Sequence, residues 1–400
     1  MMGDREGSLA RGGPAAGEGP VTGDSVVTAL DGALPPLQVA DRLARLRAGI
    51  DSAGVDALLV TALPNVRYLT GFSGSAGAVL VTGRNALLVT DGRYRTQAGE
   101  QLTAAGHDGA VELCVGGLQV QREALAAMAR SGAVARLGLE ADHVTWSAKR
   151  RWAEDLAPTQ PVPTSGVVES LRQVKDAGEL VRMARAAAIA DAALGEVLGL
   201  LGQGSREDEV ALALDTAMRR LGAEDRAFET IVASGPNAAK PHARPSKRTI
   251  LEGDPVVVDF GAIFEGYRSD MTRTFCVGGD PPGTLARVFE VVAEAQAAGV
   301  AAVRAGVAAG DVDKACRDLI AAAGWKDAFE HGTGHGVGLD IHEAPAVGPG
   351  STAILATDVV VTVEPGVYLA GIGGVRVEDT VVVTADGCHT LTRFPKDIAA

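Results

Sequence analysis

The chain has 400 residues, of which 46% are hydrophobic and 22% are charged. This length and composition are typical of a globular protein with two domains. The formal net charge of −13 argues against nucleic acid and anionic membrane surfaces as partners. No long uncharged apolar run predicts a membrane-spanning helix, and the N-terminus lacks the apolar segment of a signal peptide.

The cysteines are scattered along the chain and show no paired spacing: Cys114, Cys276, Cys316 and Cys388. They suggest neither a disulfide framework nor a zinc finger, and they suit a reducing cytosol. We therefore expect a cytoplasmic protein.

Residues 1–36 are rich in Gly, Ala and Pro without periodicity, which predicts a disordered tail. The pattern that follows predicts a smaller α/β domain over residues 37–160. Helices are expected at 37–53, 94–105 and 118–131, and strands at 56–61, 79–82, 86–90 and 138–140.

A Pro-rich run at 158–166 is the candidate linker. It would lead to a catalytic domain over residues 167–400. Ser205 is the expected N-cap of a helix that ends at Leu221. Other helices are expected at 169–201 and, as a pair, between 282 and 323, and strands at 228–234 and 249–260.

The stretch Val256–Phe275 carries two carboxylates, Asp259 and Asp270, on an expected hairpin. A buried aspartate is costly unless it is paired or coordinates a metal. Two such residues on one hairpin therefore indicate a metal site.

A second stretch echoes the first one. The segment 254–261, DPVVVDFG, is similar to 358–366, DVVVTVEPG, and the downstream D-M-T at 270–272 is similar to E-D-T at 378–380. Chance similarity between valine-rich strands is one explanation. A duplicated α/β unit, with two hairpins facing each other across a pseudo-twofold axis, is the simpler one.

Three histidines lie within the glycine-rich segment 331–345: His331, His335 and His342. Glycines let a backbone turn sharply and approach closely, and such a segment is a poor helix and a poor strand. These histidines therefore favour a site over simple packing. His242, in the loop before the first carboxylate strand, is a further candidate.

The candidate ligands carry four carboxylates and one imidazole, and their charge of −4 would be balanced by two divalent ions. They are Asp259, Asp270, His335, Glu364 and Glu378. An oxygen-rich set with one nitrogen favours Mn²⁺, with Co²⁺ or Zn²⁺ as alternatives. Two bridged metals would supply a nucleophile at neutral pH, so the expected chemistry is amide or ester hydrolysis. Phosphate-binding, serine-hydrolase and HExxH motifs are absent from the sequence.

The ordered motifs resemble those of the creatinase/prolidase-like metallopeptidases, which have the pita-bread catalytic fold. They read D-F-G, S-D-x-T-R-T-F, H-G-T-G-H-G-x-G-L-x-x-H-E-x-P, V-E-P-G and V-R-x-E-D-T, and N-V-R-Y-L-T-G-F and T-D-G-R-Y resemble that family's N-terminal domain. The resemblance covers about residues 42–395. It implies an α/β pita-bread domain of two duplicated halves, preceded by a smaller creatinase-type domain.

The resemblance also implies roles for individual residues. Asp259 and Asp270 would hold one metal, His335 and Glu364 the other, and Asp270 and Glu378 would bridge them.

Around these ligands, His242 and His342 would act at the scissile bond, and Glu364 would be the general base. His331 would line the substrate pocket. Arg376 would hold a carboxylate that belongs either to a ligand or to the substrate.

Within the family, methionine aminopeptidases lack the long N-terminal domain, and creatinases lack the metal ligands. The remaining members cleave Xaa-Pro bonds, either as aminopeptidases or as dipeptidases (prolidases). We expect a homodimeric Xaa-Pro aminopeptidase, with the dipeptidase as the alternative. A catalytically silent peptide-binding protein is the competing hypothesis, and the intact ligand set argues against it.

Overall fold

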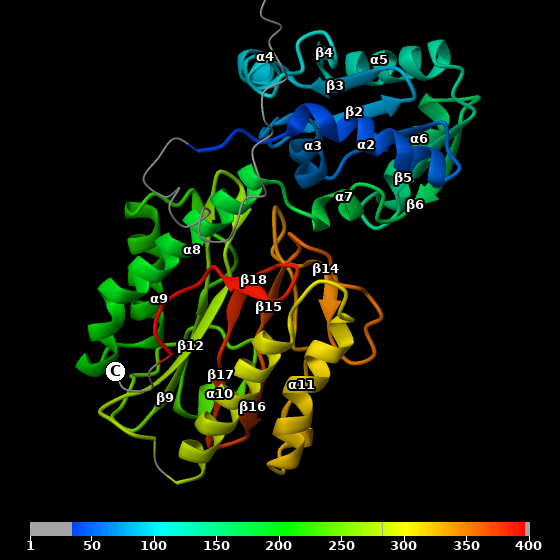
Figure 1. The fold of residues 1–400 in the computed structure, drawn as a ribbon. Coiled ribbons are helices and arrows are strands. Elements are labelled where there is room, and N and C mark those ends of the chain that lie inside the picture. The colour runs from blue at the N-terminus through cyan, green and yellow to red at the C-terminus, as the bar shows by residue number, and fades with distance from the viewer. Residues whose placement is uncertain (1–33, 282, 397–400) are drawn as a thin grey trace, which may run out of the picture.

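The computed structural model of the chain describes residues 34–281 and 283–396. It has two domains, with the N-terminal one above the larger C-terminal one in Figure 1. Most of the predicted disordered tail, residues 1–33, lies outside the described residues, and residues 34–36 have no regular secondary structure. No helix among the described residues is long and apolar enough to cross a membrane.

The N-terminal domain is a mixed sheet with the strand order β4-β3-β2-β1-β5-β6. Its strands are β1 (Ala57–Val60), β2 (Gly77–Thr82), β3 (Ala86–Thr90), β4 (Glu112–Val115), β5 (Arg136–Glu140) and β6 (Gln160–Thr164). Its helices are α2 (Val39–Ser52), α3 (Leu63–Thr70), α4 (Arg95–Ala104), α5 (Leu118–Ser131) and α6 (Trp146–Asp155), with a 3₁₀ turn η2 (Gly92–Tyr94).

Helices cover both faces of this sheet, which explains its continuous apolar strands. In β1, Leu58 and Val60 face one hydrophobic cluster, while Ala57 and Leu59 face another. Successive side chains of a strand point to opposite faces. The expected helices and strands of this domain are confirmed, with ends that shift by at most two residues.

The Pro-rich run predicted as a linker instead forms β6, which pairs in parallel with β5. The strand lies at the edge of the sheet. Gln160 N–H donates to Ala135 O at 2.8 Å, whereas Pro161 and Pro163 face the open edge, where no N–H donor is needed. Proline is tolerated there, so composition alone misidentified this segment.

The C-terminal domain contains two pairs of helices around four small sheets. The helices are α7 (Glu169–Gln173), α8 (Ala177–Val197), α9 (Glu207–Arg220), α10 (Thr284–Ala302) and α11 (Ala309–Ala322), with 3₁₀ turns η3 (Leu198–Gln203), η4 (Gly235–Ala239) and η5 (Lys326–Ala328). The strands are β7 (Asp225–Arg226), β8 (Ile231–Ser234), β9 (Pro255–Phe260), β10 (Ala262–Phe264), β11 (Tyr267–Arg268), β12 (Met271–Cys276), β13 (Gly334–Gly336), β14 (Glu343–Val347), β15 (Val360–Val363), β16 (Gly366–Leu369), β17 (Gly373–Arg376), β18 (Asp379–Val383) and β19 (Cys388–Thr390).

Three local predictions for this domain need correction. The helix expected at 169–201 is interrupted before α8, because Asp176 forms a capping box with Glu179 and starts a new helix. The N-cap of α9 is Arg206, not Ser205, and Glu209 at N3 bonds back to its backbone. The strands expected at 228–234 and 249–260 are shorter, at Ile231–Ser234 and Pro255–Phe260.

The two halves of this domain repeat each other. Helices α8 and α9 pack with β8, β9 and β12 in one apolar cluster, and α10 and α11 pack with β15 to β18 in another. Each pair of helices lies beside its own strands in Figure 1.

Reciprocal contacts join the two hairpins at equivalent positions. Thr272 Oγ1 donates to Glu378 Oε2 at 2.7 Å, and Thr380 Oγ1 donates to Asp270 O at 2.7 Å. The predicted duplication therefore appears as a pseudo-twofold arrangement in space.

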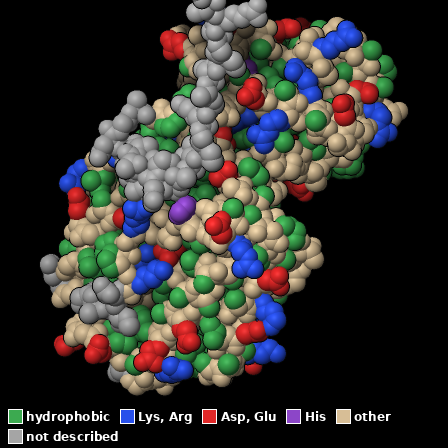
Figure 2. All heavy atoms as spheres, in the orientation of Figure 1, with side chains coloured by type: hydrophobic (Ala, Val, Ile, Leu, Met, Phe, Trp, Pro, Cys, Tyr) green, Lys and Arg blue, Asp and Glu red, His purple; other side chains and the backbone are tan. Residues whose placement is uncertain are grey.

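The two domains share an interface with a buried ion cluster. Arg42, on α2, is 1% exposed and lies 2.6 Å from Asp176 and 3.3 Å from Glu179. Its guanidinium also lies 4.0 Å from the centre of the Tyr68 ring. On the face drawn in Figure 2, acidic and basic side chains of the described residues are interspersed over both domains.

Candidate active site

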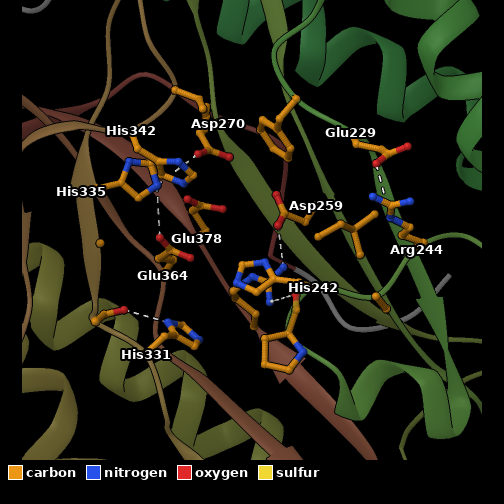
Figure 3. A pocket seen from close by; sticks show the side chains of 18 residues that line it. Glu229, His242, Arg244, Asp259, Asp270, His331, His335, His342, Glu364 and Glu378 are labelled. Atoms are coloured by element: carbon orange, nitrogen blue, oxygen red, sulfur yellow. Dashed lines mark hydrogen bonds and ion pairs between the residues drawn. The ribbon is translucent and has the colours of Figure 1, made fainter. Parts of the chain in front are cut away.

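One cavity of about 570 Å³ in the C-terminal domain brings together every candidate residue from the sequence. These residues are His242, Asp259, Asp270, His331, His335, His342, Glu364, Arg376 and Glu378. Figure 3 shows His335, His342, Asp270, Glu364 and Glu378 in one group, with Asp259 and His242 beside it.

The first hairpin supplies two of the carboxylates. Strands β9 and β12 are antiparallel, and Asp259 pairs with Thr272. Asp270 lies immediately before β12 and is 4% exposed. The valine run of β9 packs in the core, so the two acids are held on a rigid support at the cavity wall.

The second hairpin supplies two more at equivalent positions. Glu364 directly follows β15, and Glu378 directly precedes β18 and is 1% exposed. His335 comes from β13, which pairs with β15 in the same sheet. Gly334 is needed beside it, because a Cβ there would lie 2.0 Å from Thr362 O.

Three of these side chains form a compact cluster. One ligand atom from each of Asp270, His335 and Glu378 lies within 4.8 Å of the other two. His335 Nε2 lies 3.5 Å from Asp270 Oδ2 and 3.4 Å from Glu364 Oε1. Asp259 lies outside this cluster of three.

Burial makes the clustered carboxylates hard to ionise. Desolvation, followed by repulsion from Glu378 and Asp259, raises the pKa of Asp270 well above its usual range. Desolvation raises the pKa of Glu364 to about 8. The pKa of Glu378 is also raised, by burial and then by Glu364.

The histidines are kept neutral by the same desolvation. Burial lowers the pKa of His335 to about 4 and that of His331 to about 4. The pKa of His342 is lowered too, by burial and then by His242. A neutral imidazole retains a lone pair, which a metal ligand or proton acceptor requires.

Arg376 pairs with a candidate ligand in this structure. Its Nη2 lies 2.5 Å from Asp259 Oδ2, and its Nη1 donates to Tyr368 Oη at 2.7 Å. Tyr368 Oη in turn lies 2.9 Å from His331 Nε2. Of the two options left open by the sequence, the ligand carboxylate is the partner observed.

The donor set fits divalent metal ions. Asp259 Oδ1 and Glu378 Oε1 are buried and have no hydrogen-bond partner. Buried oxygens without partners are costly, and a cation would satisfy them. Asp259, Asp270, Glu364 and Glu378 supply the oxygen donors that hard divalent ions prefer, and His335 adds one nitrogen.

Sequence reasoning missed the carboxylates that bond to the loops carrying His242, His331 and His342. Glu207, Asp313 and Glu343 are buried carboxylates, and each bonds to one of these loops. Tyr368 was also missed, although it lies four residues after Glu364 on the adjoining strand β16. Glu207 and Asp313 lie on helices far along the chain from the loops they bind, and Glu343 directly follows His342 without a local pattern that shows its burial.

Comparison with known proteins matches both domains. Residues 42–174 match the creatinase/prolidase N-terminal domain, and residues 181–385 match metallopeptidase family M24. An uncharacterized peptidase of Bacillus subtilis is 40% identical over 89% of this chain and 99% of its own length.

Two solved structures are also similar. An Xaa-Pro dipeptidase from Bacillus anthracis is 38% identical with a TM-score of 0.86, covering 90% of this chain and 100% of that one. An X-Pro aminopeptidase from Thermotoga maritima is 34% identical with a TM-score of 0.80, covering 88% of this chain and 100% of that one.

These matches confirm the predicted fold class, a pita-bread catalytic domain preceded by a smaller creatinase-type α/β domain. They also agree with the cavity, where the family's ordered motifs converge on one cluster of acids and histidines. The chain therefore belongs to metallopeptidase family M24.

Proposed function

We propose that this enzyme holds two divalent metal ions and cleaves the peptide bond between an N-terminal residue and a following proline. The convergence of five potential ligands in one cavity, with two buried oxygens lacking partners, carries the proposal. Asp259 and Asp270 would hold one ion, His335 and Glu364 the other, and Asp270 and Glu378 would bridge them. Mn²⁺ is the proposed metal.

The bound ions would supply an activated water and Lewis-acid polarisation of the scissile carbonyl. Glu364, which opens onto the cavity, is the proposed acceptor of the proton from the attacking water. His242 and His342 are exposed on the cavity wall and are suited to donate hydrogen bonds to the oxyanion or to move a proton to the departing proline nitrogen.

His331 and Tyr368 would form one wall of the substrate pocket. Their rings are 5.5 Å apart at the centroids, and Phe329 packs edge-on against His331 at 5.1 Å. Arg376 would act on Asp259, because its guanidinium is already bonded to Asp259 and Tyr368. A substrate carboxylate could therefore bind Arg376 only if the buried ion pair between Arg376 and Asp259 were broken.

The use of Arg376 bears on the length of the substrate. An Xaa-Pro dipeptide presents a free carboxylate directly after the proline, and a dipeptidase gains by recognising it. Arg244 is the other arginine that lines the cavity; its side chain is 85% exposed and lies 3.6 Å from Glu229. Because no buried, uncommitted arginine lines the cavity among the described residues, we favour the aminopeptidase, which accepts longer peptides.

The dipeptidase is the second candidate, and the name of the similar Bacillus anthracis structure favours it. In that case Arg244 would exchange Glu229 for the substrate carboxylate. Such an exchange costs little, since exposed ion pairs contribute about 0–1 kcal/mol.

The test uses chelated enzyme reloaded with Mn²⁺ and the series Xaa-Pro, Xaa-Pro-amide and Xaa-Pro-Yaa. If Mn²⁺ restores cleavage of none of these three substrates, the proposed function is rejected. Comparable cleavage of the amide and the tripeptide supports an aminopeptidase, whereas cleavage confined to the dipeptide supports a dipeptidase. In a dipeptidase, Arg244→Gln should raise KM for the dipeptide, whereas in an aminopeptidase it should leave KM for the amide unchanged.

We further propose a cytoplasmic homodimer. The four cysteines are free in the structure, as in proteins of reducing compartments. Sedimentation of the purified protein tests the oligomeric state.

A further inference from the structure

Glu343 lies directly after His342 and is held by the segment that links the two domains. Its side chain is 7% exposed, accepts a charged hydrogen bond from Arg172 Nη2, and lies 3.1 Å from Lys175 Nζ. Two buried cations thus face one buried carboxylate. Burial alone raises the pKa of Glu343, but Lys175 and Arg172 outweigh it, and the pKa is lowered.

The loop that carries His342 folds around this carboxylate. Asp340 N–H donates to Glu343 Oε1 at 3.0 Å. Gly338 packs against the same group, since a Cβ at that position would lie 2.7 Å from both carboxylate oxygens. Any shift of Glu343 therefore moves the whole 338–343 loop.

His342 is in contact with the candidate metal ligand His335. Its ring packs edge-on against His335, with centroids 4.4 Å apart and planes at 73°. In Figure 3, the two rings lie next to each other beside Asp270 and Glu378. The position of the loop consequently sets the position of His342 in the active site.

The other side of Arg172 is fixed by the N-terminal domain. Arg172 Nη1 donates to Asn65 Oδ1 at 2.7 Å, and Asn65 is fully buried. Asn65 Nδ2 donates in turn to Glu140 Oε1 at 2.8 Å. Glu140 Oε2 accepts hydrogen bonds from the backbone N–H groups of Thr61 (2.6 Å) and Ala62 (2.8 Å).

We propose that Arg172 is a positioning residue for His342, through which the N-terminal domain sets the geometry of the active site. Asn65 holds Arg172, Arg172 holds Glu343, and Glu343 holds the loop that presents His342. No described residue of the N-terminal domain lines the cavity. Its effect on catalysis is transmitted by this chain of contacts.

The experiment compares Arg172→Lys with Arg42→Lys. Arg42 is the matched control because it is equally buried and pairs with two carboxylates across the same domain interface, Asp176 and Glu179. A lysine keeps the charge but loses the fork that bonds Asn65 and Glu343 together. Kinetics are measured with Mn²⁺-loaded, folded protein on an Xaa-Pro peptide.

We expect Arg172→Lys to lower kcat about 10- to 100-fold with KM little changed, as for a misplaced catalytic group. Arg42→Lys should change kcat less than about twofold. A similar loss of kcat in both variants would mean a general effect of interface damage and would overturn the proposal.

A double-mutant cycle tests whether Arg172 acts through His342. In a His342→Ala background, Arg172→Lys should cost less than about a further twofold in kcat, because the group it positions is gone. An equal loss in both backgrounds would overturn the proposal.

The activity readout rests on the proposed function, so a second readout is independent of catalysis. Hydrogen exchange of the 338–343 amides should quicken in Arg172→Lys and stay unchanged in Arg42→Lys. If the wild type cleaves no Xaa-Pro peptide, the proposed function fails while the exchange result still decides this inference. Glu343→Gln, which keeps the shape of the side chain, serves if Arg172→Lys does not fold, and it should show the same exchange pattern.

Discussion

Asp270 lies where the two hairpins meet. Its backbone O accepts a hydrogen bond from Thr380 on the opposite hairpin, and its carboxylate belongs to the cluster with His335 and Glu378. Asp270 therefore contacts both halves of the site, and it is the proposed bridge between the ions.

Asp270→Asn should lower kcat by a factor of about 10³ or more, because one ligand charge is lost at the position proposed to bridge both metals. Metal content, measured by mass spectrometry on desalted protein, should fall below that of the wild type. Asp280→Asn, at an exposed position shortly after β12, is the control and should leave both quantities unchanged. Near-normal activity in Asp270→Asn would remove this residue from the ligand set.

His107 gives the N-terminal domain a dependence on pH. It is 1% exposed, its Nε2 lies 3.0 Å from Leu69 O, and burial lowers its pKa. The folded protein therefore resists protonation, whereas the unfolded chain takes up the proton near its ordinary value of about 6.5. Stability from this group is complete above that pH and is lost as the pH falls below it.

His107→Gln keeps a donor for Leu69 O but cannot titrate. The wild type should be more stable than this variant by a margin that shrinks between pH 7.5 and pH 5, measured by urea unfolding. Other titrating groups cancel in the difference between the two proteins. A margin that is constant over this range would contradict the role of His107.

Residue types predicted much of the site but not its internal pairing. Asp259, Asp270, Glu364, Glu378 and His335 follow from motif order and from the cost of burying acids. The partner of Arg376 was left open, because the choice between ligand and substrate depends on how far β17 brings it from Asp259. The distance between Arg376 and Asp259 is set by packing between the two hairpins, so the sequence of either hairpin alone does not predict it.

At the scale of elements, each histidine loop is tied to a buried carboxylate. Glu207, in the first turn of α9, bonds to the loop of His242 at Ser234 and Ser246. Asp313, on α11, accepts from Thr333 N–H at 3.2 Å, next to His331. Glu343 does the same for the loop of His342.

Glu207→Ala should lower the free energy of unfolding by about 3 kcal/mol, because it leaves several buried N–H and O–H donors without an acceptor. Its carboxylate now accepts from the Oγ of Ser234 at 2.7 Å and that of Ser246 at 2.6 Å. Urea denaturation measures the loss. Glu209→Ala on the same helix, at an exposed ion pair, should cost well under half as much, and equal losses would contradict this account.

Local rules predicted most of the longer helices, and failed where a competing local contact decides the boundary. The break before α8 arises from the capping box of Asp176, and the start of α9 from the bond between Arg206 and Glu209. Both motifs can be identified in the sequence once the structure is known, but the sequence offered Ser205 as an equally good N-cap for α9. Choosing between them requires the path of the backbone before the helix, and an isolated antiparallel bridge between Arg206 and Thr249 fixes that path.

At the scale of the whole molecule, one hydrophobic cluster runs through both domains. It includes Leu46 of α2 and Leu58 of β1 in the N-terminal domain, together with Met183 of α8 and Val360 of β15 in the catalytic domain. The buried ion pairs of Arg42 lie at the same interface. The domains are therefore expected to lose their structure together.

Calorimetry of the metal-free protein should show one unfolding transition, with equal calorimetric and van't Hoff enthalpies. Leu46→Ala and Val360→Ala come from opposite sides of the shared cluster, and both residues are fully buried. Each should shift that single transition to lower temperature, since truncating a buried aliphatic side chain costs about 1–5 kcal/mol. Two separate transitions, each shifted by only one of the variants, would contradict a shared core.

The prolines of β6 limit how copies of this chain can associate through their sheet edges. An exposed strand edge invites a strand from a neighbouring chain, which is a common route to aggregation. Pro161 and Pro163 leave the β6 edge without the N–H groups that such a neighbour would need. Any intermolecular continuation of this sheet is consequently confined to its opposite edge, at β4.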